Sequence, residues 1–268
     1  MPSWVIVGAA RGIGFEFVNQ LSANSNNQVV AIIRNQSTAS VLNALAEQRP
    51  NIHVLETDIF SPDSLREAVA KVEKVTKGAL DVLIHNAYSA GTEAMFWTPS
   101  QFTGKETELH LELTETIKAN VIGPILTINA LLPLIHNGNE KKLIYITSGA
   151  GDVDMTRKSR LAGQIGYSAS KAGGNVVMAK YAGELADEGI KTISISPGWV
   201  ETPATEGLTA NPAVLEYLLS AFKRLDPDVA GMIKVEESVK AQLEVIARLD
   251  AESSGAFVSH HGDKKWVD

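Results

Sequence analysis

The sequence predicts a doubly wound α/β domain, with a mostly parallel seven-stranded sheet covered by helices on both faces. Short apolar runs alternate with helical patterns along the whole chain, which is the order of strand–helix–strand units with right-handed crossovers. Several runs are continuous Val, Ile and Leu, as expected for parallel strands buried on both faces. No Pro/Gly/Ser-rich linker, repeat or low-complexity tract interrupts the alternation. We therefore expect residues 1–268 to form one domain.

The expected elements follow in chain order. Apolar runs bounded by turn residues predict strands over Ser3–Gly8, Gln28–Arg34, Ile52–Thr57, Leu80–His85, Lys142–Thr147, Thr192–Ser196 and Gly255–Ser259. Apolar residues at helical spacing predict helices over 13–24, 38–48, 62–76, 106–136, 165–188 and 234–248. Ser61-Pro62-Asp63 is typical of an N-cap followed by proline at the first helical position. The stretches 88–105 and 198–235 look irregular, and a substrate loop with a short helix is expected over about 198–233.

Composition excludes several classes of protein. A chain of 268 residues with 44% hydrophobic and 21% charged residues can bury a large core and resembles a soluble globular protein. The net charge of −7 favours neither nucleic acid nor anionic membranes. Without cysteine there are no disulfides, thiolate nucleophiles or Cys-ligated metals. No apolar run reaches the ~18–20 residues that span a bilayer, and no signal peptide is recognisable. We expect a cytoplasmic protein.

The first expected strand leads into the turn Gly8-Ala9-Ala10-Arg11-Gly12-Ile13-Gly14 and then directly into a helix. Glycines at this spacing permit a tight turn and let the backbone approach a pyrophosphate closely. The helix N-terminus then offers free N–H groups and a partial positive charge to an anion. The alternative is an ordinary glycine-containing turn. The strand–turn–helix context favours a dinucleotide site of the Rossmann type that includes Gly8, Gly12, Ile13 and Gly14.

The residue at the end of the second expected strand indicates which dinucleotide, NAD(H) or NADP(H), the site would bind. NAD-binding sheets usually carry an acidic residue about 20 positions after the glycine turn, where it binds the ribose 2′-hydroxyl. Here that position is Arg34, whose guanidinium suits a 2′-phosphate. Arg11 could approach the same phosphate from the other side. Each arginine could instead be a solvated loop charge. We predict a preference for NADP(H).

Tyr167 and Lys171 lie four residues apart on an expected helix, so that their side chains share one face. A cation close to a phenol favours the phenolate, typically by ~1–3 pKa units. Such a pair prepares a tyrosine to exchange protons with an alcohol or carbonyl near neutral pH. The alternative is an exposed pair without a catalytic role.

These motifs occur together and in a fixed order along the chain. On these grounds the chain resembles the short-chain dehydrogenase/reductase family from about Ser3 to the last strand. The matching positions are Gly8, Gly12 and Gly14, Asp58 in Glu56-Thr57-Asp58-Ile59, Asn86 and Ala87, Asn120, Ser148, Tyr167 and Lys171, and Pro197, Gly198 and Thr202. Val7 replaces a threonine, and His85 and Tyr88 depart from the Asn-Asn-Ala-Gly motif. The tail Gly262–Trp266 is similar to the carbonyl-reductase branch that includes norsolorinic acid ketoreductase-like enzymes.

The resemblance implies a role for each of these residues. Ser148 and Tyr167 would donate to a substrate carbonyl oxygen, with Tyr167 delivering the proton. Lys171 would hold the nicotinamide ribose and stabilise the phenolate. The implied cofactor contacts are Asp58 and Ile59 at the adenine, Asn86 and Ala87 beside the cofactor, and Pro197, Gly198, Val200 and Thr202 near the nicotinamide. Ser148 could instead be a cap or turn hydroxyl, and Thr202 a plain loop threonine.

Asn120 can also be argued from backbone chemistry. Pro124 has no N–H, so the helical hydrogen bond to the Asn120 carbonyl cannot form. The freed carbonyl could bind a water that links Lys171 to solvent, and the resemblance assigns such a relay to this position. The alternative is a kinked helix carrying a surface asparagine.

The residues that would contact the substrate are less distinct. Met95-Phe96-Trp97 and Trp199 could form the wall of an apolar pocket, or could anchor their loops on the core. Tyr88 could point away as packing or shape the substrate site. The polar segment 149–166 could form a flap over the site. His260 and His261 are not expected to bind metal, because adjacent residues on a strand point to opposite faces.

Together these observations predict an NADPH-dependent reductase of ketones, or dehydrogenase of secondary alcohols, with an apolar or aromatic, polyketide-like substrate. An alternative is an NADP-binding protein without redox chemistry, such as an isomerase, a pericyclase or a sensor. No metal, nucleic acid or membrane partner is expected. Small residues on the helix after Tyr167 would permit close helix–helix contact, either inside the molecule or between subunits. Dimers and tetramers through such helices are common in the family, so the resemblance implies a homodimer or homotetramer.

Overall fold

The structure is a computed structural model that describes residues 1–267. Its centre is one seven-stranded sheet in the order β3-β2-β1-β4-β5-β6-β7, and every strand pairing in the described chain is parallel. The strands are β1 (Ser3–Val7), β2 (Gln28–Ile33), β3 (Ile52–Glu56), β4 (Val82–His85), β5 (Lys142–Ile146), β6 (Lys191–Ser196) and β7 (Ala256–Ser259). All seven expected strands are present, and the predicted doubly wound fold is confirmed.

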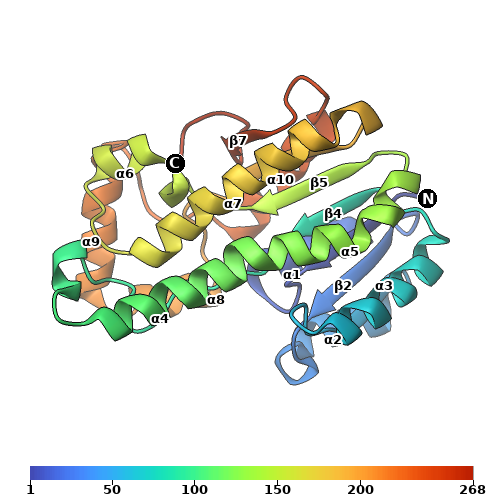
Figure 1. Ribbon diagram of the computed structural model, residues 1–268, viewed down its shortest axis with the longest axis horizontal. Helices are drawn as coiled ribbons and strands as arrows, with labels where there is room; N and C mark the ends of the chain where they lie inside the picture. The colour runs from blue at the N-terminus through green and yellow to red at the C-terminus, as the bar shows by residue number, and fades with distance from the viewer. Residues whose placement is uncertain (268) are drawn as a thin grey trace.

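Helices cover both faces of this sheet (Figure 1). On one face, α1 (Gly12–Ser22), α2 (Ser40–Gln48) and α10 (Val235–Arg248) bury apolar side chains such as Phe17, Leu42 and Ile246. On the other, α3 (Pro62–Thr76), α5 (Gly123–Asn137) and α7 (Ile165–Glu184) bury Val72, Leu131 and Met178. Burying each large apolar side chain contributes ~1.5–3 kcal/mol. The strands are thus enclosed on both sides, as their continuous apolar runs predicted.

The remaining helical segments lie in the connections. They are the short turns η1 (Gln36–Thr38), η2 (Pro99–Phe102), η4 (Gly149–Gly151) and η5 (Ala186–Glu188), the π-helical turn η3 (Lys118–Ile122), and the helices α4 (Glu106–Ile117), α6 (Val153–Ser159), α8 (Pro203–Thr209) and α9 (Pro212–Phe222). The sequence did not predict α6, and it predicted one short helix where the structure has α8 and α9. Short helices of this kind depend on packing against the rest of the molecule more than on their own periodicity.

The segments α4, η3 and α5 form one continuous helix, which the sequence predicted over 106–136. By length and composition, Glu106–Asn137 is suited to span a membrane, with a mean hydropathy of 1.5 over its most apolar window. Its apolar residues do not form one uninterrupted run, because polar uncharged residues are interspersed among them. In the protein, 44% of that window is buried, and the helix packs against α3, α7 and the sheet. Its apolar face therefore belongs to the core.

A third apolar cluster lies beyond the carboxyl ends of the strands, at the end of the molecule where Figure 1 places α6, α9 and the C-terminus. Met155 and Leu161 contribute from the segment around α6, Leu218 and Phe222 from α9, and Trp266 from the tail. Segments far apart in sequence thus enclose this end of the protein.

Candidate active site

Two adjoining cavities open at the carboxyl ends of the strands. One, of about 810 Å³, has Arg11, Arg34 and Asp58 among its lining residues. The other, of about 180 Å³, is mostly apolar and contains Ser148, Tyr167 and Lys171. Residues that line both are Ile13, Asn86, Tyr88, Ala90 and Thr202. In open α/β sheets, ligands bind at this edge.

The glycine turn between β1 and α1 has the shape that the sequence predicted. Gly8 and Gly12 have φ values of 86° and 57°. A Cβ atom at Gly8 would lie 2.7 Å from the backbone of Ala87, and one at Gly14 would lie 2.1 Å from the Gly8 carbonyl oxygen. Gly8 and Gly14 therefore allow close packing of strand, helix and the β4 loop, whereas Gly12 and Ile13 face the larger cavity.

No side chain in the described chain caps the first turn of α1, so its N–H groups remain available to an anion. The Asn86 side chain instead donates to the Gly8 carbonyl at 2.9 Å, and the backbone N–H of Ala87 donates to Val7 at 2.8 Å. These bonds hold the turn against the end of β4. Together with exposed Arg11 and Arg34, the donor set suits a phosphate-bearing dinucleotide.

The two residues after β3 point in different directions. Asp58 faces the larger cavity, and its Oδ1 accepts from the backbone N–H of Phe60 at 2.9 Å. Ile59 does not line that cavity. Its side chain packs toward Gly123 of α5 and lines a groove between α3 and α5. The apolar side chain of Ile59 thus turns away from this polar cleft, so the predicted cofactor contact at Ile59 would fall to its backbone.

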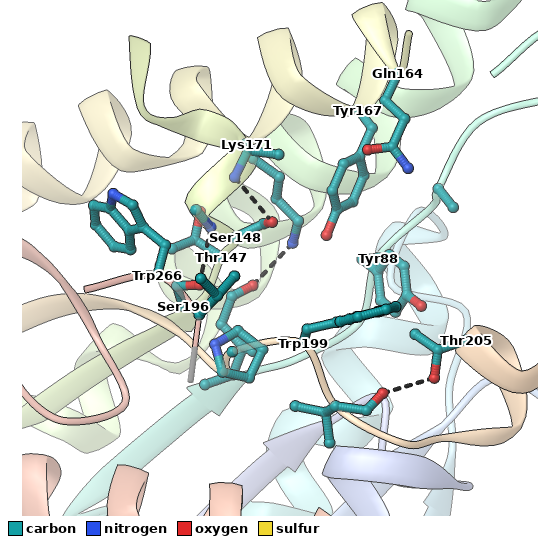
Figure 2. A pocket seen from close by; sticks show the side chains of 18 of the residues that line it. Tyr88, Thr147, Ser148, Gln164, Tyr167, Lys171, Ser196, Trp199, Thr205 and Trp266 are labelled. Carbon is teal, nitrogen blue, oxygen red and sulfur yellow. Dashed lines mark hydrogen bonds between the residues drawn. The ribbon is translucent and has the colours of Figure 1, made fainter. Parts of the chain in front are cut away.

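Ser148, Tyr167 and Lys171 come from two elements and meet in the smaller cavity, where their polar ends point toward one another (Figure 2). Ser148 follows β5, and its Oγ accepts from the backbone N–H of Ala150 at 3.2 Å. That bond uses the hydroxyl as an acceptor and leaves its proton free to donate. Ser148 is thus both a cap, as the alternative interpretation held, and a potential donor toward Tyr167 or a substrate.

Lys171 is buried, and its Nζ donates to the Ile146 carbonyl at 2.9 Å. Burial lowers the pKa of Lys171 to about 7. Burial raises the pKa of Tyr167, and Tyr88 adds to the rise, while the Ser148 hydroxyl opposes it. The predicted lowering of the Tyr167 pKa by Lys171 is therefore absent in the protein itself. The physical reason is that Nζ turns toward Ile146 and lies 5.7 Å from the Tyr167 ring centroid.

Asn120 lies in the π-helical turn and is fully buried. Its side chain accepts from the Ser89 N–H at 2.9 Å and donates to the Ser89 carbonyl at 2.8 Å and to Ser170 Oγ at 2.9 Å. The backbone carbonyl that Pro124 frees accepts from the Tyr145 hydroxyl at 2.9 Å. The surface-asparagine alternative is wrong, and a tyrosine bonds the carbonyl to which a relay water was assigned.

The loop after β6 crosses both cavities. Pro197, Gly198, Val200 and Thr202 all line the smaller one. The Thr202 hydroxyl caps α8 by accepting from the backbone N–H of Thr205 at 3.3 Å. Thr202 is therefore a helix cap that also faces the site, rather than a plain loop threonine.

The smaller cavity has an apolar wall. Its large apolar lining residues include Met95, Met155, Leu161, Trp199, Leu208, Leu218, Phe222, Trp266 and Val267. For Met95 and Trp199, this agrees with the first of their two interpretations, that of a pocket wall. Trp97 instead packs on Phe102 with ring centroids 5.3 Å apart, so it anchors its loop. From the segment 149–166, Met155 and Leu161 face the cavity, whereas the charged side chains of α6 are exposed.

Tyr88 faces the site and is 48% exposed. Its ring meets that of Tyr167 edge-on, with centroids 6.2 Å apart, and it lines both cavities. The sequence left open whether Tyr88 points away as packing or shapes the substrate site, and this geometry fits the second interpretation. Sequence reasoning missed the walls formed by Phe222 and Trp266. An aromatic residue in an otherwise polar tail was the available signal for Trp266.

His260 and His261 do not lie on a strand, contrary to the expectation that their side chains point to opposite faces. Strand β7 ends at Ser259, and the two imidazole rings lie on the same side with centroids 4.0 Å apart. Within residues 1–267, no group of three or more His, Cys, Asp or Glu side chains is placed to hold a metal ion.

Comparison with known proteins finds close relatives. The family model for short chain dehydrogenases matches residues 3–213. The chain is 48% identical over 267 residues to the short-chain dehydrogenase/reductase atnB of an Arthrinium species, covering 100% of both proteins. It is 37% identical over 273 residues to the short chain dehydrogenase virK of Hypocrea virens, again covering 100% of both.

Solved structures show the same fold. The NADPH-bound carbonyl reductase from chicken fatty liver superposes with a TM-score of 0.77 at 28% identity, covering 98% of each chain. The carbonyl reductase Sniffer of D. melanogaster has a TM-score of 0.77 at 27% identity, also covering 98% of each chain.

Proposed function

Because this chain belongs to the short-chain dehydrogenase/reductase family, we propose that it reduces ketones with NADPH, or oxidises the corresponding secondary alcohols. One observation carries the proposal. The polar ends of Ser148, Tyr167 and Lys171 converge where a cleft containing two arginines adjoins an apolar cavity. A cofactor in the cleft and a carbonyl compound in the cavity would meet at these three side chains.

The residues of the cleft fit NADP(H). The first turn of α1 would bind the pyrophosphate, Arg34 and Arg11 the 2′-phosphate, and Asp58 the adenine end. When bound, the nicotinamide supplies or accepts the hydride. Thr202 lines both cavities and Lys171 lines the smaller one, and these positions suit contacts to the carboxamide and the ribose.

Ser148 and Tyr167 would act on the substrate oxygen. During reduction negative charge grows on that oxygen, and two hydroxyl donors stabilise it most effectively in a site that excludes water. Because its pKa is raised by burial, Tyr167 holds its proton at neutral pH and can deliver it to the new alkoxide. Lys171 then stabilises the phenolate that remains.

The substrate is an apolar carbonyl compound, with an aromatic, polyketide-like molecule favoured. Trp199, Phe222 and Trp266 provide aromatic surface in the smaller cavity, and such surfaces pack well against flat rings.

The test is to follow NADPH absorbance with a panel of aliphatic and aromatic ketones, comparing wild type with Tyr167→Phe. Losing the general acid should lower kcat by roughly 10²–10⁴-fold, while cofactor affinity measured by fluorescence stays unchanged. Tyr181→Phe is the matched control, because this tyrosine of the same helix bonds Asn129 outside the site. Full activity of Tyr167→Phe would refute the proposal. Conversion without consumption of NADPH would favour an isomerase, a pericyclase or a sensor.

The choice of cofactor is tested by Arg34→Asp. A charge-assisted hydrogen bond contributes ~1.5–3 kcal/mol, so NADPH affinity should fall by roughly 10–100-fold. NADH affinity should hold or rise, because a carboxylate can bind the free ribose hydroxyls. Titration of both cofactors by fluorescence measures the change. Equal affinity of wild type for NADPH and NADH would contradict the assignment of Arg34.

A further inference from the structure

Behind the site lies a tyrosine to which neither the motifs nor the comparisons assign a role. Tyr145, the last but one residue of β5, is 0% exposed. Its ring centroid lies 4.8 Å from the Nζ of Lys171, closer than the ring of Tyr167 or of Tyr88. Its hydroxyl donates to the Asn120 carbonyl at 2.9 Å. One side chain therefore contacts both the buried ammonium and the π-helical turn.

The fold makes specific room for this ring. Gly174 of α7 lies directly against it, and a Cβ atom there would come within 2.6 Å of the ring and of the hydroxyl oxygen. Glycine inside a helix is unfavourable relative to alanine, because it loses more backbone freedom on folding. The Tyr145 ring thus explains why this position of the helix is a glycine, since any side chain here would collide with the ring.

The ammonium has few other partners. Among the described residues no carboxylate forms an ion pair with Lys171, and its hydrogen bond goes to the neutral Ile146 carbonyl. The titratable groups around it are His85 from β4, Tyr145 from β5, Tyr167 from α7 and Tyr88 from the loop after β4. Burial and the charge of Lys171 lower the pKa of His85 to about 3, so His85 stays neutral. The aromatic faces are the remaining favourable contacts for a cation.

We propose that Tyr145 is a positioning residue of this site, whose ring stabilises the ammonium of Lys171 and whose hydroxyl occupies the Asn120 carbonyl freed by the π-helical turn. This rests on the proposed function, in which Lys171 must be charged to stabilise a phenolate. In this arrangement the tyrosine joins the lysine to the turn.

The ring and the hydroxyl have separable effects. Attraction between a cation and an aromatic face favours the charged form of the amine, so the ring holds the pKa of Lys171 higher than burial alone would leave it. Tyr145→Leu removes the ring and should lower that pKa by roughly 0.5–1.5 units. Tyr145→Phe keeps the ring and should change it much less, although loss of the bond to Asn120 should reduce the melting temperature.

The experiment measures the titration of Lys171 directly. Protein with ¹³C-labelled lysine is titrated by NMR, and the Cε signal of Lys171 is identified by its loss in Lys171→Arg. Gly174→Ala tests the same ring without altering either partner, because the added methyl must displace Tyr145 and so lower the pKa of Lys171. Gly183→Ala on the same helix is the matched control, since nothing lies within 4 Å of a Cβ there.

A lower Lys171 pKa in Tyr145→Leu and Gly174→Ala, with Tyr145→Phe and Gly183→Ala close to wild type, supports the proposal. Unchanged titration in Tyr145→Leu, or an equal shift in Tyr145→Phe, overturns it. If the wild type reduces ketones, the pH profile of kcat in each variant should shift together with the pKa of Lys171 measured by NMR. If the wild type reduces no ketone, the proposed function fails, while the NMR titration still decides the role of Tyr145.

Discussion

At the residue scale, the site depends on a charge in an unfavourable place. Lys171 is buried with one carbonyl acceptor, and burial lowers its pKa from 10.5 to about 7. Placing it there is a cost to folding that a surface lysine would not carry. Its position beside Tyr167 and Ser148 gives the reason for accepting that cost.

This burial predicts how stability depends on pH. Between pH 7 and 10.5 the unfolded lysine binds a proton that the folded one has released, so stability should rise with pH through this window. One proton corresponds to a slope of up to ~1.4 kcal/mol per pH unit. Urea unfolding of wild type and Lys171→Met from pH 6.5 to 9 isolates the contribution of Lys171 to the free energy of unfolding. The stability of wild type relative to the variant should increase above ~pH 7. A difference that stays constant with pH would contradict the buried ammonium.

At the element scale, the π-helical turn η3 joins the long helix to the site. Proline at position 124 removes one helical donor, and the widened turn directs the Asn120 side chain toward the loop after β4. There it makes three hydrogen bonds, two to the backbone of Ser89 and one to Ser170. An irregular turn thus fixes the loop that carries Tyr88.

Asn120→Ala should therefore destabilise the protein by about 2–4 kcal/mol, because each buried polar group left without a partner costs ~1–3 kcal/mol. The backbone carbonyl is retained, so any loss of kcat reports on the loop that the side chain holds. Denaturant unfolding and steady-state kinetics measure the two effects. Asn129→Ala, which removes a single bond from an exposed position of the same helix, should cost no more than about 1 kcal/mol. Equal effects of the two variants would refute the role of the turn.

At the scale of the whole molecule, the substrate cavity is assembled from distant segments. Trp266, 9% exposed, stacks on Phe257 with ring centroids 4.6 Å apart and packs against Gly149. Lys264 lies over this pair, 4.5 Å from the Phe257 ring centroid. The tail thereby forms one wall of the cavity and a part of the third apolar cluster.

Trp266→Ala should cost ~3–5 kcal/mol of stability by opening a cavity. It should also raise activity on bulky ketones relative to small ones, because removing the indole ring enlarges the substrate cavity. Thermal unfolding and the ratio of kcat/KM values across a ketone series measure both. Val153→Ala in α6, where the side chain is 80% exposed, is the control and should change neither. An unchanged ratio in Trp266→Ala would show that the tail does not limit the substrate.

Local sequence patterns explain which parts of the fold could be predicted. The strands were predicted because a strand buried on both faces needs a continuous apolar run. Both ends of α3 were predicted to the residue, and Ser61 and Pro62 mark its start. Most other boundaries differ by one or two residues, whereas α7 ends at Glu184, four residues before its predicted end. Helix α6 escaped detection because seven residues carry too little periodicity. The directions of the two C-terminal histidines were misjudged because both residues follow the last strand, which ends at Ser259.

The sequence by itself determined the doubly wound sheet, the glycine turn and the order of the site residues, since each depends on the backbone preferences and spacing of neighbouring residues. Only the tertiary structure decided that Tyr145 lies beneath Lys171, that Tyr88 faces Tyr167 and that Trp266 closes the cavity. These contacts join segments far apart in the chain. They form only when packed helices and strands bring those segments together, and no local pattern records that packing.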